Sequence, residues 1–289
     1  MKLQVFTLNA FAKTENGGNP AGVLLNSDGL SDEQMLKIAN KVGFSETAFV
    51  QKSDKADFKV KFFTPTAEVD LCGHATIATF YLLANRQIIQ PSQYKQETKA
   101  GVLKIEILKD GSVLMDQNPP KFFDKIDKKP IAESLNISTE IIMDDLPIQI
   151  VSTGLKDIFI PIKSLSQLTQ IKPDFEKVKD ISKKFDVIGY HLFALETKFG
   201  STAHCRNLAP LYDIDEEAAT GTSSGALSCY IYKYGKITES QINDLIFEQG
   251  YSMNRPSEIR AKLDIHGTEI TRVRVGGIAS NIKRIEVEI

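Results

Sequence analysis

A chain of 289 residues, 42% of them hydrophobic, is long enough for one or two domains that each bury a core. Its 35 Lys and Arg nearly balance its 37 Asp and Glu, and no basic run is interleaved with aromatic residues, so nothing favours nucleic acid or a membrane surface as a partner. The start lacks the long apolar core of a signal peptide, and the three cysteines are an odd number. We therefore expect free thiols and a cytoplasmic protein.

Hydrophobic periodicity and turn residues predict short strands that alternate with a few helices. In chain order we predict a strand at 3–9, a glycine-rich loop at 17–22, a helix at 31–42, strands at 45–50 and 58–63, a helix at 73–84, strands at 102–108, 112–116, 148–152 and 157–162, a helix at 174–185, strands at 187–196 and 202–208, a helix at 220–232, and strands at 258–265, 270–275 and 282–289. Ser31 and Gln34 form a capping box for the first helix, and Gly43 ends it. Asp110 and Gly111 predict a hairpin turn between two of the strands.

The segment that begins at Cys72 combines reactive side chains with an uncharged helix. After Cys72, Gly73 and His74 come ten residues without charge, which are too few to cross a bilayer and predict a helix buried on all sides. The free N–H groups of its first turn, with the positive end of the helix dipole, would attract an anion, and Gly73 would let a ligand approach the backbone. The alternative is a core helix whose Cys acts as a small hydrophobe and whose His is simply hydrogen-bonded.

The same pattern occurs a second time. Thr220, Gly221 and Thr222 correspond to Cys72, Gly73 and His74 at an offset of 220 − 72 = 148 residues, and each copy follows a strand, a proline and an acidic loop. Self-similarity at this spacing predicts two like domains, with two helix N-termini available to face one cleft.

We place the domain boundary in the linker-like stretch 118–130, which holds three prolines. The predicted domains are 1–118, completed by the C-terminal strand 278–289, and 130–277.

Other chemical motifs are weak or missing. The four His and three Cys form no pair at ligand spacing, so we predict no metal site, and the dinucleotide and P-loop glycine motifs are absent. Residues 221–225 do match the Gly-x-Ser-x-Gly elbow of serine hydrolases, with Ser223 as nucleophile. The acidic lead-in at 215–219 is poor context for an elbow, and His266 is the one later His, so the hydrolase remains a minor alternative.

Eight motifs in order, spread over nearly the whole chain, resemble the PhzF-like family of phenazine biosynthesis. They are Gly18–Val23, Ser45–Val50, Phe63–Pro65, Glu68–Thr76, Arg206 with Ala209-Pro210, Ala219–Gly221, Arg255–Ser257 and Val275–Gly277. The resemblance implies the diaminopimelate-epimerase-like fold, of class α+β, with two pseudo-symmetric domains that each wrap a mostly antiparallel sheet around a central helix. It also implies an isomerase without cofactor or metal, acting on a small carboxylate and working as a homodimer.

Position in the family's motifs assigns the candidate site residues. The resemblance implies that Glu46 transfers the proton and that His74 and Glu217 help to hold the substrate. The further residues of the same site by this comparison are Asn19, Asp70, Cys72, Gly73, Gly221 and Thr222.

The chain departs from the family at two positions near the second helix. Glu217 stands where the family commonly has Asp, and Ala218 replaces a proline that stiffens the turn. Racemases of the same fold use two cysteines, one at each helix start. Here Cys72 corresponds to Thr220, and Thr cannot act as a base near neutral pH, so a two-thiol mechanism is excluded.

We therefore expect an isomerase that moves a proton within a small carboxylic acid. Glu46 would take the proton and return it at another carbon, for which we expect burial to raise its pKa. The alternative that stays open is a protein that binds small carboxylates on the same fold without chemistry.

Overall fold

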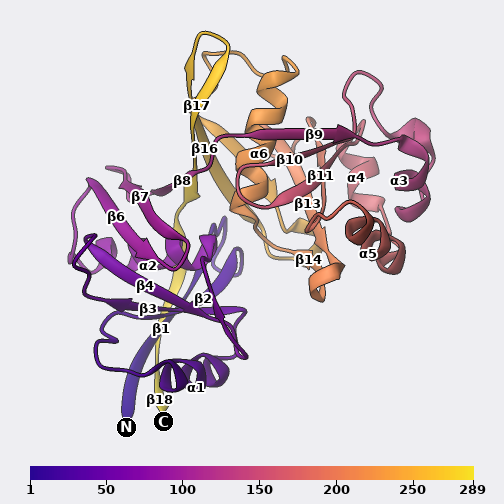
Figure 1. The fold of residues 1–289 in the computed structure, drawn as a ribbon. Helices are drawn as coiled ribbons and strands as arrows, with labels where there is room; N and C mark the ends of the chain where they lie inside the picture. Colours follow the sequence, from indigo (N-terminus) through magenta and orange to yellow (C-terminus); the bar gives the residue numbers. More distant parts are fainter. The chain divides into compact units, whose positions relative to one another are not determined.

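The computed structural model describes residues 1–289 and divides the chain into two compact units (Figure 1). Unit 1 consists of Met1–Asp116 and Gly276–Ile289, and unit 2 of Gln117–Val275. The stretch 118–130, where we expected a linker, instead contains strand β9 and the start of helix α3. No helix is both long and apolar enough to traverse a bilayer.

Unit 1 contains two helices and nine strands. The strands are β1 (Lys2–Ala10), β2 (Asn19–Leu24), β3 (Glu46–Gln51), β4 (Phe58–Phe63), β5 (Glu68–Val69), β6 (Gln93–Thr98), β7 (Gly101–Ile107), β8 (Val113–Gln117, whose last residue falls in unit 2) and β18 (Ala279–Glu288), and the helices are α1 (Asp32–Val42) and α2 (Gly73–Asn85). The first and last strands of the chain pair antiparallel, with Lys2 opposite Glu288, which places the two termini side by side (Figure 1).

Helix α2 forms the centre of unit 1. It packs against β1, β2, β3, β7 and β18, so strands surround it, and eight of its residues are buried. Its buried threonines, Thr76 and Thr79, donate their hydroxyl protons to the carbonyls of Cys72 and Ala75 one turn earlier. Because both hydroxyls are hydrogen-bonded within the helix, a helix with polar residues can lie in the core.

Unit 2 has the same kind of centre. Its elements are β9 (Lys121–Lys125), α3 (Lys128–Ser134), β10 (Gln149–Ser152), β11 (Lys156–Pro161), α4 (Leu165–Gln170), α5 (Phe175–Lys184), β12 (Gly189–Ala194), β13 (Ala203–Ala209), β14 (Ile214–Glu217), α6 (Gly221–Lys233), β15 (Leu245–Gln249), β16 (Ser257–His266) and β17 (Glu269–Gly277, which ends in unit 1), with 3₁₀ turns at Thr139–Ile141, Pro210–Tyr212 and Tyr251–Met253. Helix α6 packs against β10, β11 and β16, while α4 and α5 pack against β12.

The two units repeat one order of strand pairing. In unit 1 the pairs β1–β2, β3–β4, β4–β5 and β6–β7 are antiparallel, and β2–β3 and β4–β6 are parallel. In unit 2 the pairs β10–β11, β12–β13, β13–β14 and β15–β16 are antiparallel, and β11–β12 and β13–β15 are parallel. The buried helix follows the fifth strand of this order in both units, which is the repeat that the 148-residue offset indicated in the sequence.

Most predicted elements are confirmed, including the capping box of Ser31 and Gln34 and the end of α1 at Gly43 in a left-handed conformation. Two predictions were wrong in kind. The expected loop at 17–22 contributes Asn19 to Gly22 to strand β2, and the expected acidic loop contains strand β14. Both strands are short of β-branched residues, so their partner strands rather than their own propensities make them extended.

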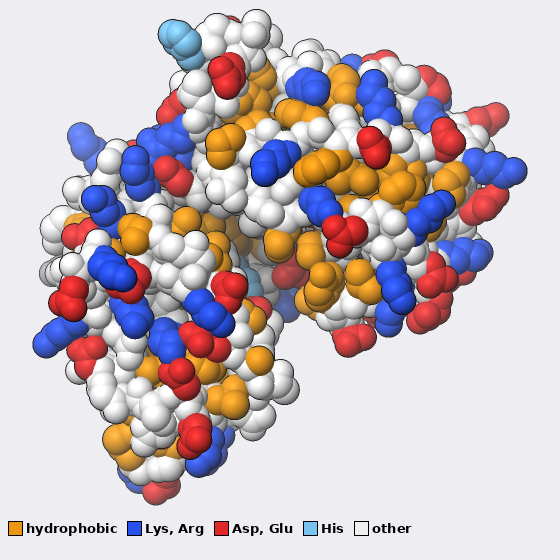
Figure 2. Space-filling view, viewed as in Figure 1, with side chains coloured by type: hydrophobic (Ala, Val, Ile, Leu, Met, Phe, Trp, Pro, Cys, Tyr) orange, Lys and Arg blue, Asp and Glu red, His pale blue; other side chains and the backbone are white.

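Charged side chains of both signs are scattered over the molecular face in Figure 2, as the near balance of charge leads one to expect.

Candidate active site

Three reactive side chains of unit 1 meet at the start of α2. Strands β2 and β3 run parallel, which places Asn19 and Glu46 at matching ends of neighbouring strands beside that helix start. His74 Nε2 lies 3.2 Å from Glu46 Oε2, and His74 Nδ1 lies 3.4 Å from Cys72 Sγ and 3.5 Å from Asn19 Nδ2. The imidazole of His74 is thus held between a carboxylate on one ring nitrogen and a thiol and an amide on the other.

The charge state of this group differs from our expectation. Burial by itself would raise the pKa of Glu46, but the hydrogen bond and the charge of His74, with Ser45 and Cys72, outweigh burial and lower the pKa below its ordinary value. Our prediction of a raised pKa was therefore wrong. Burial likewise opposes the charge on His74, yet its contacts with Cys72 and Glu46 raise its pKa, while burial raises the pKa of the Cys72 thiol.

These pKa shifts indicate the charge states at neutral pH: Glu46 is ionised, His74 is protonated and the Cys72 thiol is neutral. This pair carries one negative and one positive charge in a largely buried setting, where charges interact strongly. The carboxylate is in the form that accepts a proton.

The first turn of α2 keeps its backbone N–H groups free of any side-chain cap. Cys72 is the N-cap residue and makes no capping hydrogen bond, whereas Ser31 caps α1 and Asp174 caps α5 in the ordinary way. A Cβ atom on Gly73 would meet only Met115 Cε, at 3.6 Å, so no tight packing requires glycine there. An uncapped helix start beside a protonated histidine suits a carboxylate.

In unit 2, strand alternation separates the two neighbouring glutamates of β14. Glu216 forms a two-pronged ion pair with Arg206, at 3.0 Å and 2.9 Å, while the carboxylate of Glu217 accepts a hydrogen bond of 2.7 Å from Thr220 Oγ1 at the start of α6. The Thr220 hydroxyl oxygen accepts a hydrogen bond of 3.0 Å from Gln249 Nε2 and none from its own helix, so α6 also begins without a side-chain cap.

Gln249 holds this second helix start in place, and the sequence did not single it out. Its amide accepts from the backbone N–H of Thr220 and donates to the carbonyl of Glu217. The following Gly250 has φ +80°, and a Cβ there would lie 2.3 Å from Arg255 O and 2.6 Å from Ala218 O. The glycine of the Gln-Gly pair was the one signal in the sequence that could have pointed to this support.

A chain of buried polar side chains lies behind the start of α6. Ser223 Oγ donates to Asp157 Oδ2 at 2.5 Å, Asn207 Nδ2 donates to Ser223 Oγ at 3.3 Å, and Asn207 also lies 3.2 Å from His191 Nδ1. Burial raises the pKa of Asp157 to about 7, helped by the nearby charge of Glu217.

Ser223 is therefore not a hydrolase nucleophile. Only 2% of it is exposed, no histidine accepts its proton, and His266 lies exposed at the end of β16.

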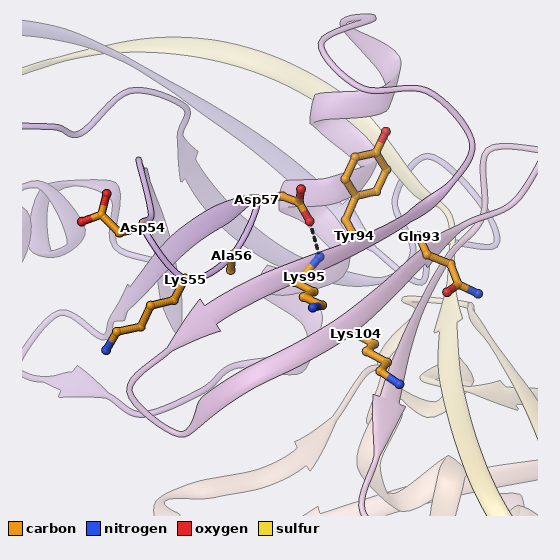
Figure 3. A pocket seen from close by; sticks show the side chains of 8 residues that line it. All are labelled: Asp54, Lys55, Ala56, Asp57, Gln93, Tyr94, Lys95 and Lys104. Carbon is orange, nitrogen blue, oxygen red and sulfur yellow. Dashed lines mark hydrogen bonds between the residues drawn. The ribbon is translucent and has the colours of Figure 1, made fainter.

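Asp70 does not join the group around His74. Its side chain is 66% exposed and pairs with Lys99. A hollow of about 540 Å³ elsewhere on unit 1 is also unsuited to the chemistry, because it is lined mainly by exposed residues (Figure 3): Asp54, Lys55, Ala56, Asp57, Gln93, Tyr94, Lys95 and Lys104. We place the candidate site at the start of α2 because a carboxylate, an imidazole and a thiol meet there. The depth of the surface is not the reason for this choice.

Comparison with known proteins identifies the family. The family model described as phenazine biosynthesis-like protein matches residues 8–284. The chain belongs to this family. An uncharacterized isomerase of Clostridium acetobutylicum is 33% identical over 99% of this chain and 98% of its own. The trans-2,3-dihydro-3-hydroxyanthranilate isomerase of Pseudomonas fluorescens is 28% identical over 93% of this chain and 94% of its own.

Solved structures agree with this assignment. A Bacillus anthracis phenazine biosynthesis protein of the PhzF family has a TM-score of 0.88 with 33% identity, over the full length of both chains. A hydroxyproline epimerase of Agrobacterium vitis, with a TM-score of 0.60 and 11% identity over 100% of this chain and 93% of its own, shares the fold alone. The expected epimerase-like α+β fold is confirmed, and the protein is an isomerase of the phenazine biosynthesis-like family.

Proposed function

We propose that the protein moves a proton within a small carboxylic acid without a cofactor, and that Glu46 carries the proton. The observation that carries the proposal is the 3.2 Å pair of Glu46 and His74 at the uncapped start of α2, in a chain whose relatives are named isomerases. The lowered pKa keeps Glu46 ionised, which is the form that can accept a proton.

The second half of the reaction requires the proton to leave Glu46 again. A substrate carboxylate at the start of α2 would share the charge of His74 and displace water from Glu46. Both effects raise the pKa of Glu46, because the stabilising partner is divided and the desolvation grows. Substrate binding would in this way make Glu46 a stronger base toward the substrate C–H bond, and transfer of the proton to another carbon of the substrate anion would restore the ionised carboxylate.

The substrate that we propose is a small carboxylate with an exchangeable C–H bond, the class to which the named substrate of the Pseudomonas fluorescens enzyme belongs. By position in the family motif, Glu217, Gly221 and Thr222 are proposed substrate contacts, with Asn19, Gly73 and Cys72. Glu217 is one methylene longer than the Asp usual in the family, so we expect the substrate to differ from that of relatives with Asp. We also propose a homodimer, which light scattering after size exclusion tests.

Incubation with candidate carboxylates in heavy water tests the proposal. NMR should show loss of one C–H signal from the true substrate, and Glu46→Gln should slow this exchange by roughly a hundredfold or more, the scale of a lost general base. Gln keeps the shape of Glu, so the fold should be kept, but His74 loses its ionised partner and the melting temperature should fall. The matched control is Glu33→Gln on the exposed face of α1, which should exchange at the wild-type rate.

Two results would contradict the proposal. Exchange at the wild-type rate in Glu46→Gln, together with loss of exchange in Cys72→Ser, would make the thiol the base. Tight binding of a carboxylate with no exchange in any protein would favour the binding function over catalysis.

A further inference from the structure

The last residue of strand β15 holds the turn that leads from Glu217 into helix α6. Gln249 is fully buried, accepts a hydrogen bond of 3.2 Å from the backbone N–H of Thr220 and donates one of 2.8 Å to the carbonyl of Glu217. Its side-chain amide thus joins the two ends of the segment 217–220. The two residues between them, Ala218 and Ala219, are buried and have no polar side chain that could fix the turn. The turn therefore depends on a side chain from another strand.

The backbone determines which way round the Gln249 amide lies. A backbone N–H can only donate and a carbonyl can only accept, so Oε1 faces Thr220 N and Nε2 faces Glu217 O. Nε2 has a second hydrogen, which it donates to Thr220 Oγ1 at 3.0 Å. Because the amide can only donate there, the single hydroxyl proton of Thr220 points to Glu217 Oε2, 2.7 Å away. Gln249, Thr220 and Glu217 form a hydrogen-bond relay with one fixed direction.

The relay holds the Glu217 carboxylate beside the first turn of α6. Glu217 lies directly opposite Asn207 on the neighbouring strand β13, so the two side chains share one face of the sheet. Asn207 in turn donates a hydrogen bond to Ser223 in the first turn of α6. The proposed substrate contacts Gly221 and Thr222 belong to the same turn. A carboxylate held at this place can take part in positioning a substrate.

We propose that Gln249 and Thr220 are positioning residues, which direct one hydroxyl proton at the carboxylate of Glu217 and so fix its orientation toward the substrate. Both residues act through Glu217, and no bond is made or broken in the relay. This role rests on the proposed function, in which Glu217 is a substrate contact.

Two substitutions of Thr220 test the middle of the relay. Thr220→Val keeps the branched shape and removes the hydroxyl, whereas Thr220→Ser keeps the hydroxyl and removes the methyl group. Deuterium exchange into the substrate should slow roughly ten- to a hundredfold in Thr220→Val, because a misplacement of about 1 Å can cost a hundredfold. Thr220→Ser should stay close to the wild-type rate. Loss of packing would give the opposite order, since Val fills the space better than Ser.

A substitution of Gln249 tests the start of the relay. Gln249→Glu keeps the acceptor for the Thr220 N–H but replaces the donor with a second oxygen, which would draw the hydroxyl proton away from Glu217. Exchange should slow as in Thr220→Val. The matched control is Gln149→Glu, which changes another buried amide of unit 2, one that donates to the carbonyl of Phe123. Both Gln→Glu variants should have a lower melting temperature, but Gln149→Glu should keep the wild-type rate per folded protein.

A spectroscopic measurement without substrate separates the relay from catalysis. The ¹³C NMR signal of the Glu217 carboxyl, assigned with Glu217→Gln, should move in Thr220→Val at constant pH and stay near its wild-type position in Thr220→Ser. Circular dichroism shows whether each variant is folded, and Thr220→Val gives an independent result if Gln249→Glu is not.

The outcomes distinguish the two proposals. An unchanged carboxyl signal in Thr220→Val would overturn the relay. A moved signal with wild-type exchange in Thr220→Val would overturn the positioning role and leave the proposed function intact. Absence of exchange in the wild type with every carboxylate would overturn the proposed function and the positioning role with it, while a moved signal would still establish the relay.

Discussion

A substitution at Asp157 tests how a buried carboxyl group in unit 2 affects the stability of the protein. The residue lies in β11 with 3% of its surface exposed, and its Oδ2 accepts a hydrogen bond from Ser223. Burial and the charge of Glu217 raise its pKa to about 7, against 3.8 in an exposed position. The substitution Asp157→Asn keeps the size and the hydrogen bond to Ser223 but removes the ionisable group.

The sign of the effect follows from proton linkage. Below pH 3.8 the carboxyl is protonated in both the folded and the unfolded chain, so it has no effect on the pH dependence. Between pH 3.8 and about 7 the unfolded chain loses the proton while the folded protein keeps it, so the free energy of unfolding falls as the pH rises. The whole shift corresponds to about 4 kcal/mol, because each pKa unit is worth about 1.4 kcal/mol.

Asp157→Asn should therefore be more stable than the wild type at pH 8, and the difference should shrink by about 2–3 kcal/mol at pH 5. Urea unfolding followed by circular dichroism measures this, since the chain has no Trp for fluorescence. The matched control is Asp180→Asn on the exposed side of α5, which should show no such trend. A wild type as stable as Asp157→Asn at pH 8, or a difference that does not change with pH, would refute the argument that Asp157 is held neutral by burial.

Two further predictions concern the helix starts and the turn after β15, where Gly250 lies close to Ala218. Sulfate at low millimolar concentration should raise the melting temperature with a saturable dependence, while chloride at equal ionic strength should not. The reason is that the uncapped first turns of α2 and α6 attract an oxyanion. Equal effects of the two salts would count against an anion site. Gly250→Ala should destabilise the protein by about 3 kcal/mol, since its Cβ would clash with two carbonyls in a left-handed conformation. Gly267 also has a positive φ angle, but no atom lies close to the position of an added Cβ. Gly267→Ala should therefore lower the free energy of unfolding by only about 1–2 kcal/mol in the same denaturation experiment.

Local sequence determined the elements whose cause is local. The uncharged run after His74 predicts a helix that only a core can hold, and α2 is buried as expected. The capping box at Ser31 and the glycine at 43 define both ends of α1 because caps act within one turn. The repeat of the Cys72 motif at Thr220 predicted two like units, and strand pairing repeats in the same order in both. Motif order alone named Glu46 and His74 before any distance was known.

Only the tertiary structure decided the properties that depend on distance between segments. Glu46 and His74 are 28 residues apart in sequence and 3.2 Å apart in space, and this contact reverses the expected sign of the Glu46 pKa shift. Residue type allowed either outcome, because burial raises a carboxyl pKa and a nearby cation lowers it, and their balance depends on geometry. Two aspartates show the same dependence on tertiary geometry. Motif position assigned Asp70 to the site, but it lies exposed beside Lys99. No motif marked Asp157, yet it is buried behind α6.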